Sequence, residues 1–158
     1  MTDRVRTVLI TPANQMLAIR RQRPNTAVYR VLPGGHVEPA DTSLETALLR
    51  EIREELAGAA TIHSLLRVLD EPSGCRQYIY LARIDTWSFP DRTGSEFTDP
   101  GNGTYTLDAV PFTAEQLAVL NLKPDRIAQF LIEELRNSID VFDLPDLRPP
   151  PPGVPGVG

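Results

Sequence analysis

Residues 34–56 have the sequence GGHVEPADTSLETALLREIREEL, and this stretch is the most informative part of the chain. It opens with two glycines after a β-like run, which indicates unusual backbone dihedrals or a close approach to a ligand. The periodicity that follows predicts a helix over residues 43–56. Thr42 and Glu45 have the spacing of a capping box, which predicts how that helix begins.

The predicted helix carries three carboxylates on one side. On a helical wheel at ~100° per residue, Glu51, Glu54 and Glu55 fall within an arc of roughly 100°. The adjoining arc is apolar and contains Leu48, Leu49, Ile52 and Leu56. Clustered carboxylates repel one another unless a cation lies among them, and Mg²⁺ prefers carboxylate oxygens together with water and substrate phosphates. The pattern therefore indicates a divalent metal that neutralises a diphosphate and lowers the pKa of a bound water.

Two neighbouring features suit the same site. A carbonyl of the Gly34–Gly35 backbone could approach the ion, and Arg50 could orient a carboxylate through a charge-assisted hydrogen bond. Each feature alone has a plainer interpretation. A run of Arg and Glu is typical of a solvated helix face with i,i+4 pairs, and a Gly-Gly pair is common in turns. The combination at this spacing is what favours a metal site.

Length, composition and charge limit the number of domains, the partners and the location that we expect. The 158 residues predict one domain, and 41% hydrophobic with 23% charged residues is typical of a soluble globular protein. A net charge of -5 argues against binding nucleic acid through a basic surface. Cys75 is the only cysteine, so an internal disulfide cannot form. Because the sequence shows neither a membrane-length apolar run nor a signal-peptide pattern, we expect a cytoplasmic protein without membrane contact.

The order of predicted elements indicates an α+β domain with mixed sheet pairing. Expected strands cover residues 4–11, 16–20, 28–32, 61–69, 76–84 and 104–112, of which the first pair and the fourth and fifth form hairpins. A short helix at 113–120 and an amphipathic helix after Pro124 follow, while 88–103 reads as a long surface loop. We expect a single domain over residues 1–143 and a flexible Pro/Gly-rich tail over residues 144–158.

The informative stretch resembles the Nudix box of the Nudix (MutT-like) hydrolase family. That box has a glycine, an acidic residue several positions later, and then Arg-Glu-apolar-x-Glu-Glu. The matching residues here are Gly35, Asp41, Arg50, Glu51, Ile52, Glu54 and Glu55. The flanking sequences LPGGHVEP (residues 32–39) and LDAVPF (residues 107–112) also look like the family, and the resemblance covers roughly residues 4–137.

The box departs from the family pattern in three places. Asp41 stands where Glu is usual and Ala40 replaces a glycine, and eight residues rather than seven separate Asp41 from Arg50. Ala57 stands where a glycine is expected, with Gly58 one position later. The extra residue precedes the helix, so the register of Arg50 with the glutamates is kept. From its position, Asp41 is expected to cap the helix or to interact with the helix dipole.

The resemblance implies a mixed-sheet α/β/α sandwich that hydrolyses a diphosphate linkage in a nucleoside diphosphate derivative, using Mg²⁺ or Mn²⁺. Candidate substrates include ADP-ribose, dinucleoside polyphosphates, nucleoside triphosphates and nucleotide sugars. The implied metal ligands are Glu51, Glu54, Glu55 and the carbonyl of Gly34. Either Glu51 or Glu54 would act as the catalytic base, and Arg50 would hold the helix carboxylates in place. A homodimer is plausible because many relatives dimerise.

Substrate contacts are predicted from residue type. Arg20, Arg21 and Arg23 precede the box and could contact phosphates, although a solvated strand end explains them equally well. Tyr29, Trp87 and Phe89 could stack on a base, although aromatic strand residues usually belong to the core. His36 could touch the substrate. The resemblance also implies an additional acid from a distant loop, because family members often recruit one, and Glu96 is the candidate for it.

Two other functions fit the same family resemblance. A non-catalytic Nudix-fold module that senses a nucleotide would be expected to lose box carboxylates, and this sequence keeps all three on the helix. A Nudix-fold isomerase acting on an isoprenoid diphosphate would need a suitably placed cysteine, and Cys75 lies in a predicted hairpin.

Overall fold

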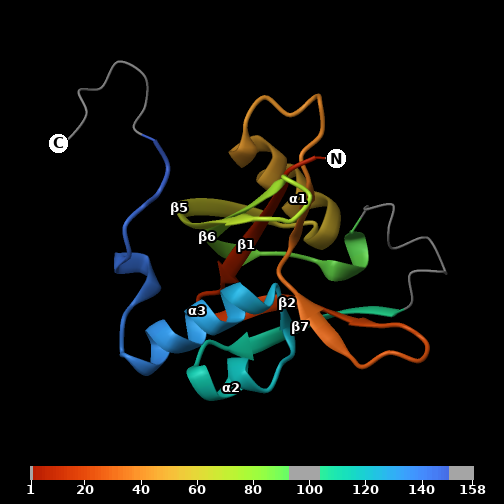
Figure 1. Ribbon diagram of the computed structural model, residues 1–158. Coiled ribbons are helices and arrows are strands. Elements are labelled where there is room, and N and C mark those ends of the chain that lie inside the picture. The colour runs from red at the N-terminus through yellow and green to blue at the C-terminus, as the bar shows by residue number, and fades with distance from the viewer. Residues whose placement is uncertain (1, 93–103, 150–158) are drawn as a thin grey trace.

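The chain forms a curled mixed sheet with helices on both faces, in a computed structural model that describes residues 2–92 and 104–149 (Figure 1). The strands are β1 (Arg4–Ile10), β2 (Gln15–Gln22), β3 (Tyr29–Val31), β4 (Gly34–His36), β5 (Ala59–Asp70), β6 (Arg76–Thr86), β7 (Thr104–Pro111) and β8 (Leu122–Lys123). The helices are α1 (Leu44–Leu56), α2 (Ala114–Ala118) and α3 (Asp125–Arg136), with 3₁₀ turns at Phe89–Asp91 and Val141–Asp143.

The strands follow the order β5-β6-β1-β2-β3-β8, with β4 added to β1 and β7 added to β2. β1 lies parallel to β6 and antiparallel to β2 and β4. The predicted β1–β2 and β5–β6 hairpins are confirmed. β4 and β8 were not predicted. The two residues of β8 leave no periodicity in a sequence, and the two glycines of β4 indicate a turn rather than a strand.

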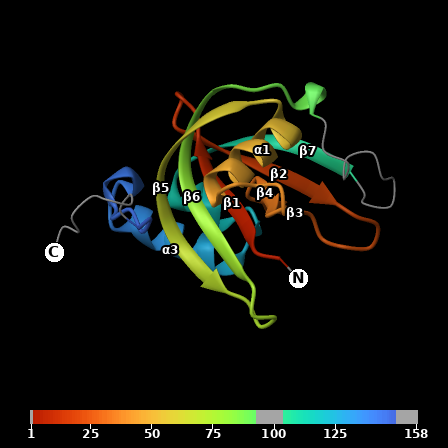
Figure 2. The ribbon, with the colours of Figure 1, turned by 90° about the horizontal axis from the view of Figure 1, so that it is seen from above.

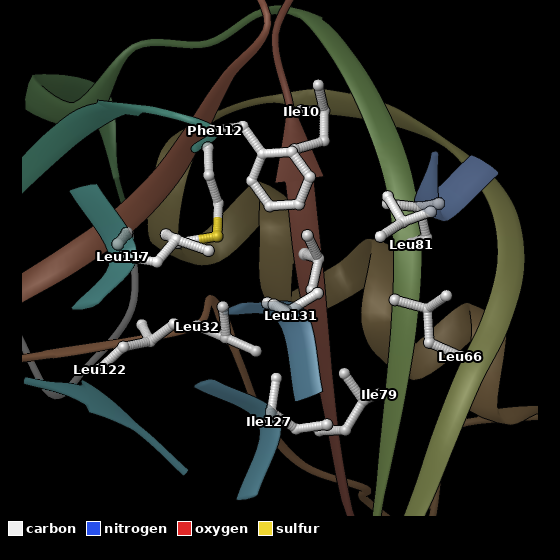
Figure 3. Packing of buried hydrophobic residues seen from close by; sticks show 14 of the residues in the cluster. Ile10, Leu32, Leu66, Ile79, Leu81, Phe112, Leu117, Leu122, Ile127 and Leu131 are labelled. Carbon is white, nitrogen blue, oxygen red and sulfur yellow. The ribbon is translucent and has the colours of Figure 1, made fainter. Parts of the chain in front are cut away.

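Alternating side chains of the central strands fill a separate core on each face of the sheet. In β1, Val8 and Ile10 join one cluster while Val5 and Leu9 join the other. The first cluster is closed by α2 and α3, and Figure 3 shows Ile127 and Leu131 of α3 beside residues of the sheet. The second cluster is closed by α1, which Figure 2 shows above the strands. The predicted α/β/α sandwich is therefore confirmed.

The N-cap of α1 differs from the sequence prediction, whereas the helix ends at Leu56 as predicted. Ser43 is the N-cap, and its hydroxyl accepts a hydrogen bond from the backbone N–H of Thr46 at 3.0 Å. The predicted capping box of Thr42 with Glu45 is therefore wrong by one position. Ala57 ends the helix in the left-handed conformation with φ 46° that the expected glycine adopts more easily, and its N–H bonds to the carbonyl of Arg53.

The segment after the second 3₁₀ turn packs against the edge strand β5, whereas the sequence predicts that packing ends at residue 143. The N–H of Leu147 donates to the carbonyl of Leu65, and the N–H of Leu65 donates to the Asp146 carboxylate. Arg148 donates to the carbonyl of His63. Figure 2 shows this blue segment outside β5. Of the helices in the described residues, none has the length and hydropathy that spanning a bilayer requires.

Candidate functional site

The carboxylate side of α1 faces a cavity of about 430 Å³ beside β4 and β1. Acidic side chains from α1 and from the preceding loop form part of its lining, namely Glu38, Glu51, Glu54 and Glu55. The two glycines of β4 and His36 adjoin them. The remaining lining comes from the sheet and includes Arg4, Arg6, Ile19, Arg21, Val31 and Tyr105. The cavity thus brings the predicted glutamates of the helix together with residues that lie far away in the sequence.

The glycines of β4 allow the buried glutamates to approach the backbone. A Cβ atom on Gly34 would lie 2.0 Å from the carbonyl oxygen of Val5 in the paired strand, and the φ of Gly34 is +147°. The N–H of Gly34 donates to Glu55 Oε1 at 2.6 Å. A Cβ atom on Gly35 would lie 2.7 Å from the carboxyl carbon of Glu51. Both positions therefore lack space for a side chain, and the group that approaches Gly35 is a carboxylate of the chain itself rather than the ligand that the sequence indicated.

Arg50 forms hydrogen bonds with carboxylates of α1 and of the loop that precedes the helix. Its guanidinium carries five N–H donors, and the structure gives each of them an acceptor. Nη1 donates to Glu51 Oε1 at 3.1 Å and to Glu54 Oε2 at 3.2 Å. The other three bonds reach Asp41 twice and the carbonyl of His36 once. Arg50 therefore joins two glutamates of the helix to the loop that precedes it.

The structure gives Asp41 a different role from the one expected. Its two oxygens accept from Nε and Nη2 of Arg50, each at 3.0 Å, in a bidentate ion pair. Its Oδ2 also accepts from the N–H of Glu38 at 2.7 Å. The bonds from Arg50 and from this N–H lower the pKa of the Asp41 carboxyl. The expectation of a helix cap is wrong, because Ser43 holds that position.

The three clustered glutamates of α1, Glu51, Glu54 and Glu55, differ in exposure. Glu51 and Glu55 are buried, at 7% and 6% exposure, whereas 38% of the Glu54 side chain is exposed. Glu54 is therefore the helix carboxylate most open to a water molecule in the cavity. The buried pair faces Arg6, whose guanidinium donates to the carbonyl of Leu32 at 3.0 Å. Burial lowers the pKa of Arg6, while the nearby charges of Glu55 and Glu51 oppose that shift.

A sequence model of the NUDIX domain matches residues 1–131. The chain belongs to the Nudix family. A MutT solved in work on the Aliivibrio salmonicida and Vibrio cholerae proteins is 18% identical, with 84% of this chain and 98% of that chain covered and a TM-score of 0.58. The NUDIX hydrolase from Nitrosomonas europaea is 19% identical, with coverages of 87% and 89% and a TM-score of 0.58.

A third structure with this fold is an ADP-ribose pyrophosphatase from Streptococcus suis. It is 17% identical to the Nudix domain described here, with 85% of this chain and 92% of that chain covered and a TM-score of 0.55. At such identities the likeness concerns the fold. No curated protein sequence matches the chain significantly.

The structure separates the three predicted phosphate-binding arginines of the Nudix domain. Arg21 lines the cavity, and its guanidinium lies 4.6 Å from the ring centre of Tyr105 and 5.8 Å from that of Tyr29. Arg20 precedes it on β2, so its side chain points to the opposite face of the sheet and does not line the cavity. Arg23 lies beyond the end of β2 in an exposed loop.

Arg4 and Arg6 of the Nudix domain were not predicted, although both line the cavity. They flank buried Val5 in β1, so the sequence signal was two charged residues at alternate positions at the start of the first strand. That signal does not say what the charges face. The antiparallel pairing of β1 with the glycine strand β4 is what brings these arginines beside the carboxylates.

Of the remaining predicted substrate contacts that the structure describes, one lies at the cavity and the others do not. His36 lies at the rim, where Nδ1 is 3.0 Å from the hydroxyl of Thr2. Burial and the charges of Arg4 and Arg6 lower the pKa of His36. Trp87 and Phe89 pack against the core under α1, so they do not meet the cavity. Glu96 lies outside the described residues.

The donor chemistry of the Nudix domain fits a divalent cation. Carboxylate oxygens are the ligands that Mg²⁺ and Mn²⁺ prefer, and Arg50 Nη1 shows that one positive atom can contact Glu51 and Glu54 together. Within residues 2–92 and 104–149, no three His, Cys, Asp or Glu side chains are at present arranged so that they could coordinate one metal ion. The family generally uses a divalent metal. The carboxylates of α1 that line the cavity, Glu51, Glu54 and Glu55, are the ones placed where they could hold one.

Proposed function

We propose that this chain hydrolyses a diphosphate linkage in a nucleoside diphosphate derivative with the help of Mg²⁺ or Mn²⁺. Nudix family members are pyrophosphohydrolases, which gives the reaction class. One observation carries the proposal for this chain: a single cavity has carboxylates along α1 and three arginines along the sheet. Arginine is suited to phosphate oxygens, and carboxylates are suited to the metal that accompanies a diphosphate.

The proposed roles follow from burial and position. Glu51, Glu54 and Glu55, with the carbonyl of Gly34, would hold the metal, which when bound supplies charge neutralisation and a more acidic water. Glu54, the exposed helix carboxylate, would take the proton from the attacking water. Arg4, Arg6 and Arg21 would contact the phosphates on the opposite side of the cavity.

The neighbourhood of Arg21 suits a nucleoside. The guanidinium stacks near Tyr105 within the cavity, and Tyr29 lies on the other neighbouring strand. Flat rings and a guanidinium offer π faces on which a base can stack. We therefore propose that the base lies toward Tyr105 and the scissile linkage toward α1.

The test is turnover of a panel of diphosphates with Mg²⁺ and with Mn²⁺, with products separated by chromatography. The panel contains ADP-ribose, a dinucleoside polyphosphate, a nucleoside triphosphate and a nucleotide sugar. Wild type should cleave at least one compound, and Glu54→Gln should be slower by at least on the order of 10²-fold. Glu133→Gln, which changes an exposed glutamate of α3, is the control and should keep full activity.

The alternative is a nucleotide-sensing module built on the same fold. It would bind a panel compound without cleaving it, and Glu54→Gln would then leave the affinity nearly unchanged. Binding by calorimetry together with the absence of products under both metals would favour this alternative over the enzyme.

A further inference from the structure

A second, smaller cavity of about 190 Å³ adjoins the candidate site. Arg4 and His36 line both cavities, so a bound molecule could extend from one into the other past these two residues. The rest of the second cavity is formed by the start of the chain and by the β5–β6 hairpin, and includes Thr2, Glu71, Ser73, Cys75 and Gln77.

Strand pairing explains why the two cavities share a border. Arg4 of β1 lies opposite His36 of β4 on one side and opposite Gln77 of β6 on the other. Paired residues of neighbouring strands place their side chains on the same face, so these three form a row across the sheet. Neighbouring strands lie about 4.8 Å apart, which makes the row roughly 10 Å wide. The row extends the site toward β6, away from β2 and Arg21.

Arg4 is the cation at this border. Its side chain is half-buried, and among the described residues its guanidinium has no hydrogen-bond or ion-pair partner. Arg76, the other arginine of the second cavity, is exposed, and its Nε donates to Asp70 at 3.1 Å. Phosphate oxygens are acceptors that a guanidinium matches well. The donors of Arg4 therefore suit a phosphate that reaches the border between the two cavities.

The interior of the second cavity offers acceptors as well as donors. The side chain of Gln77 is buried, accepts from Nε of Arg6 at 3.3 Å and donates to the carboxylate of Glu71. A carboxylate repels a phosphate but accepts hydrogen bonds from hydroxyl groups. The interior therefore suits a neutral group rich in hydroxyls, whereas a phosphate belongs at the border.

The size of the second cavity narrows the choice of group. Pockets that hold a drug-sized molecule measure about 300 Å³ or more. The second cavity is smaller, at about 190 Å³, so a second nucleoside does not fit within it. A single sugar ring has the hydroxyl groups and the smaller size that this lining requires.

We propose that the second cavity binds the sugar of a nucleoside diphosphate sugar such as ADP-ribose, with Arg4 at the phosphate next to that sugar. This inference rests on the proposed function for the place of the diphosphate between α1 and β1. The base then lies toward β2 and the sugar toward β6. A nucleoside triphosphate has no group for the second cavity.

Cys75 gives a readout that does not depend on hydrolysis, because it is the only cysteine of the chain and lines the second cavity. The rate at which Cys75 reacts with the thiol reagent DTNB is measured with Mg²⁺ and the α,β-methylene analogue of ADP-ribose, whose phosphorus–carbon bridge cannot be hydrolysed. At about ten times its Kd, measured by calorimetry, this analogue should slow the reaction on the order of tenfold. The α,β-methylene analogue of ADP, which lacks the sugar, is the matched ligand and should leave the rate nearly unchanged.

Glu71→Gln tests the lining itself. The substitution keeps the length of the side chain and an oxygen that can accept from Gln77, but removes the charge. We expect the Kd of the ADP-ribose analogue to rise on the order of tenfold, since hydrogen bonds to charged groups are the stronger ones. The Kd of the ADP analogue should not change. Glu133→Gln, on α3, is the matched control and should bind both analogues as wild type does.

The sugar site is overturned if both analogues protect Cys75 equally, if neither protects it, or if Glu71→Gln weakens both analogues alike. Its failure is distinct from a failure of the proposed function. Selective protection of Cys75 without cleavage of any panel compound would support the sugar site and count against hydrolysis. Cleavage of a nucleoside triphosphate by a protein whose Cys75 stays reactive with the ADP-ribose analogue would support hydrolysis and overturn the sugar site.

Discussion

A Cβ atom on Gly35 would lie 2.7 Å from the carboxyl carbon of Glu51, so these two residues fit together only because position 35 has no side chain. Glu51 cannot retreat easily, since it is buried and its Oε1 accepts from Arg50. An alanine at position 35 would therefore displace either β4 or the carboxylate. The conformational freedom of glycine is not the reason here, because the need at this position is space.

We expect Gly35→Ala to slow hydrolysis on the order of 10²-fold, the scale of loss when a reacting group is misplaced by about 1 Å. Steady-state kinetics with the best panel compound measures this. Gly74→Ala is the control: it lies in a turn with φ +91° and meets no other atom within 4 Å. It should lower stability by about 1–2 kcal/mol, because a side chain disfavours a positive φ, while leaving turnover unchanged. Equal rates for Gly35→Ala and wild type would contradict the close contact with Glu51.

Arg21 and Arg20 are neighbours in β2 that face opposite sides of the sheet, and they make a matched pair. We expect Arg21→Gln to raise KM on the order of tenfold, because hydrogen bonds to charged groups contribute about 1.5–3 kcal/mol. Arg20→Gln should leave KM unchanged, since Arg20 does not line the cavity. The melting temperatures of both variants show whether either change acts through stability. A similar rise in KM for both arginines would argue against this placement of the substrate.

The helix and its carboxylate face could be predicted because periodicity places residues on a helix without knowledge of the rest of the chain. The same reasoning could not find Arg4 and Arg6, since their value depends on the pairing of β1 with β4. It could not assign Asp41 either, because a loop path decides whether a carboxylate caps a helix or reaches a side chain nine positions later. Pairing and loop paths are long-range properties, and single residues carry little signal for them.

We expect Arg50→Lys to impair the enzyme strongly, although the substitution keeps the positive charge. An ammonium has three donors and cannot span the bidentate site on Asp41 while also reaching Glu51 and Glu54. We expect kcat to fall by at least on the order of 10²-fold, with a lower melting temperature. Arg53→Lys, an exposed change three residues later on α1, should leave both quantities close to wild type. A variant Arg50→Lys with normal kcat would show that alignment by the guanidinium is dispensable.

The C-terminal segment should give the stability of the domain an acid-sensitive component. Burial alone would raise the pKa of the Asp146 carboxyl, but hydrogen bonds from Arg148 and from the N–H of Leu65 lower it to about 2, from 3.8. A carboxyl whose pKa is lowered by folding stabilises the native state above its unfolded pKa. This contribution should therefore be complete above about pH 4 and should be lost as the pH falls from 3.8 to about 2.

Asp146→Asn removes the charge and keeps an oxygen that can accept from Leu65. We expect it to lower stability at pH 7 by about 1 kcal/mol or less, since 38% of the Asp146 side chain is exposed. That corresponds to a fall in Tm of at most about 2–4 °C, which thermal unfolding can resolve. The difference from wild type should shrink between pH 4 and pH 2. Asp85→Asn, at an exposed carboxylate of β6, should give no such trend. A constant difference across that range would mean that the Asp146–Arg148 pair does not hold the segment against β5.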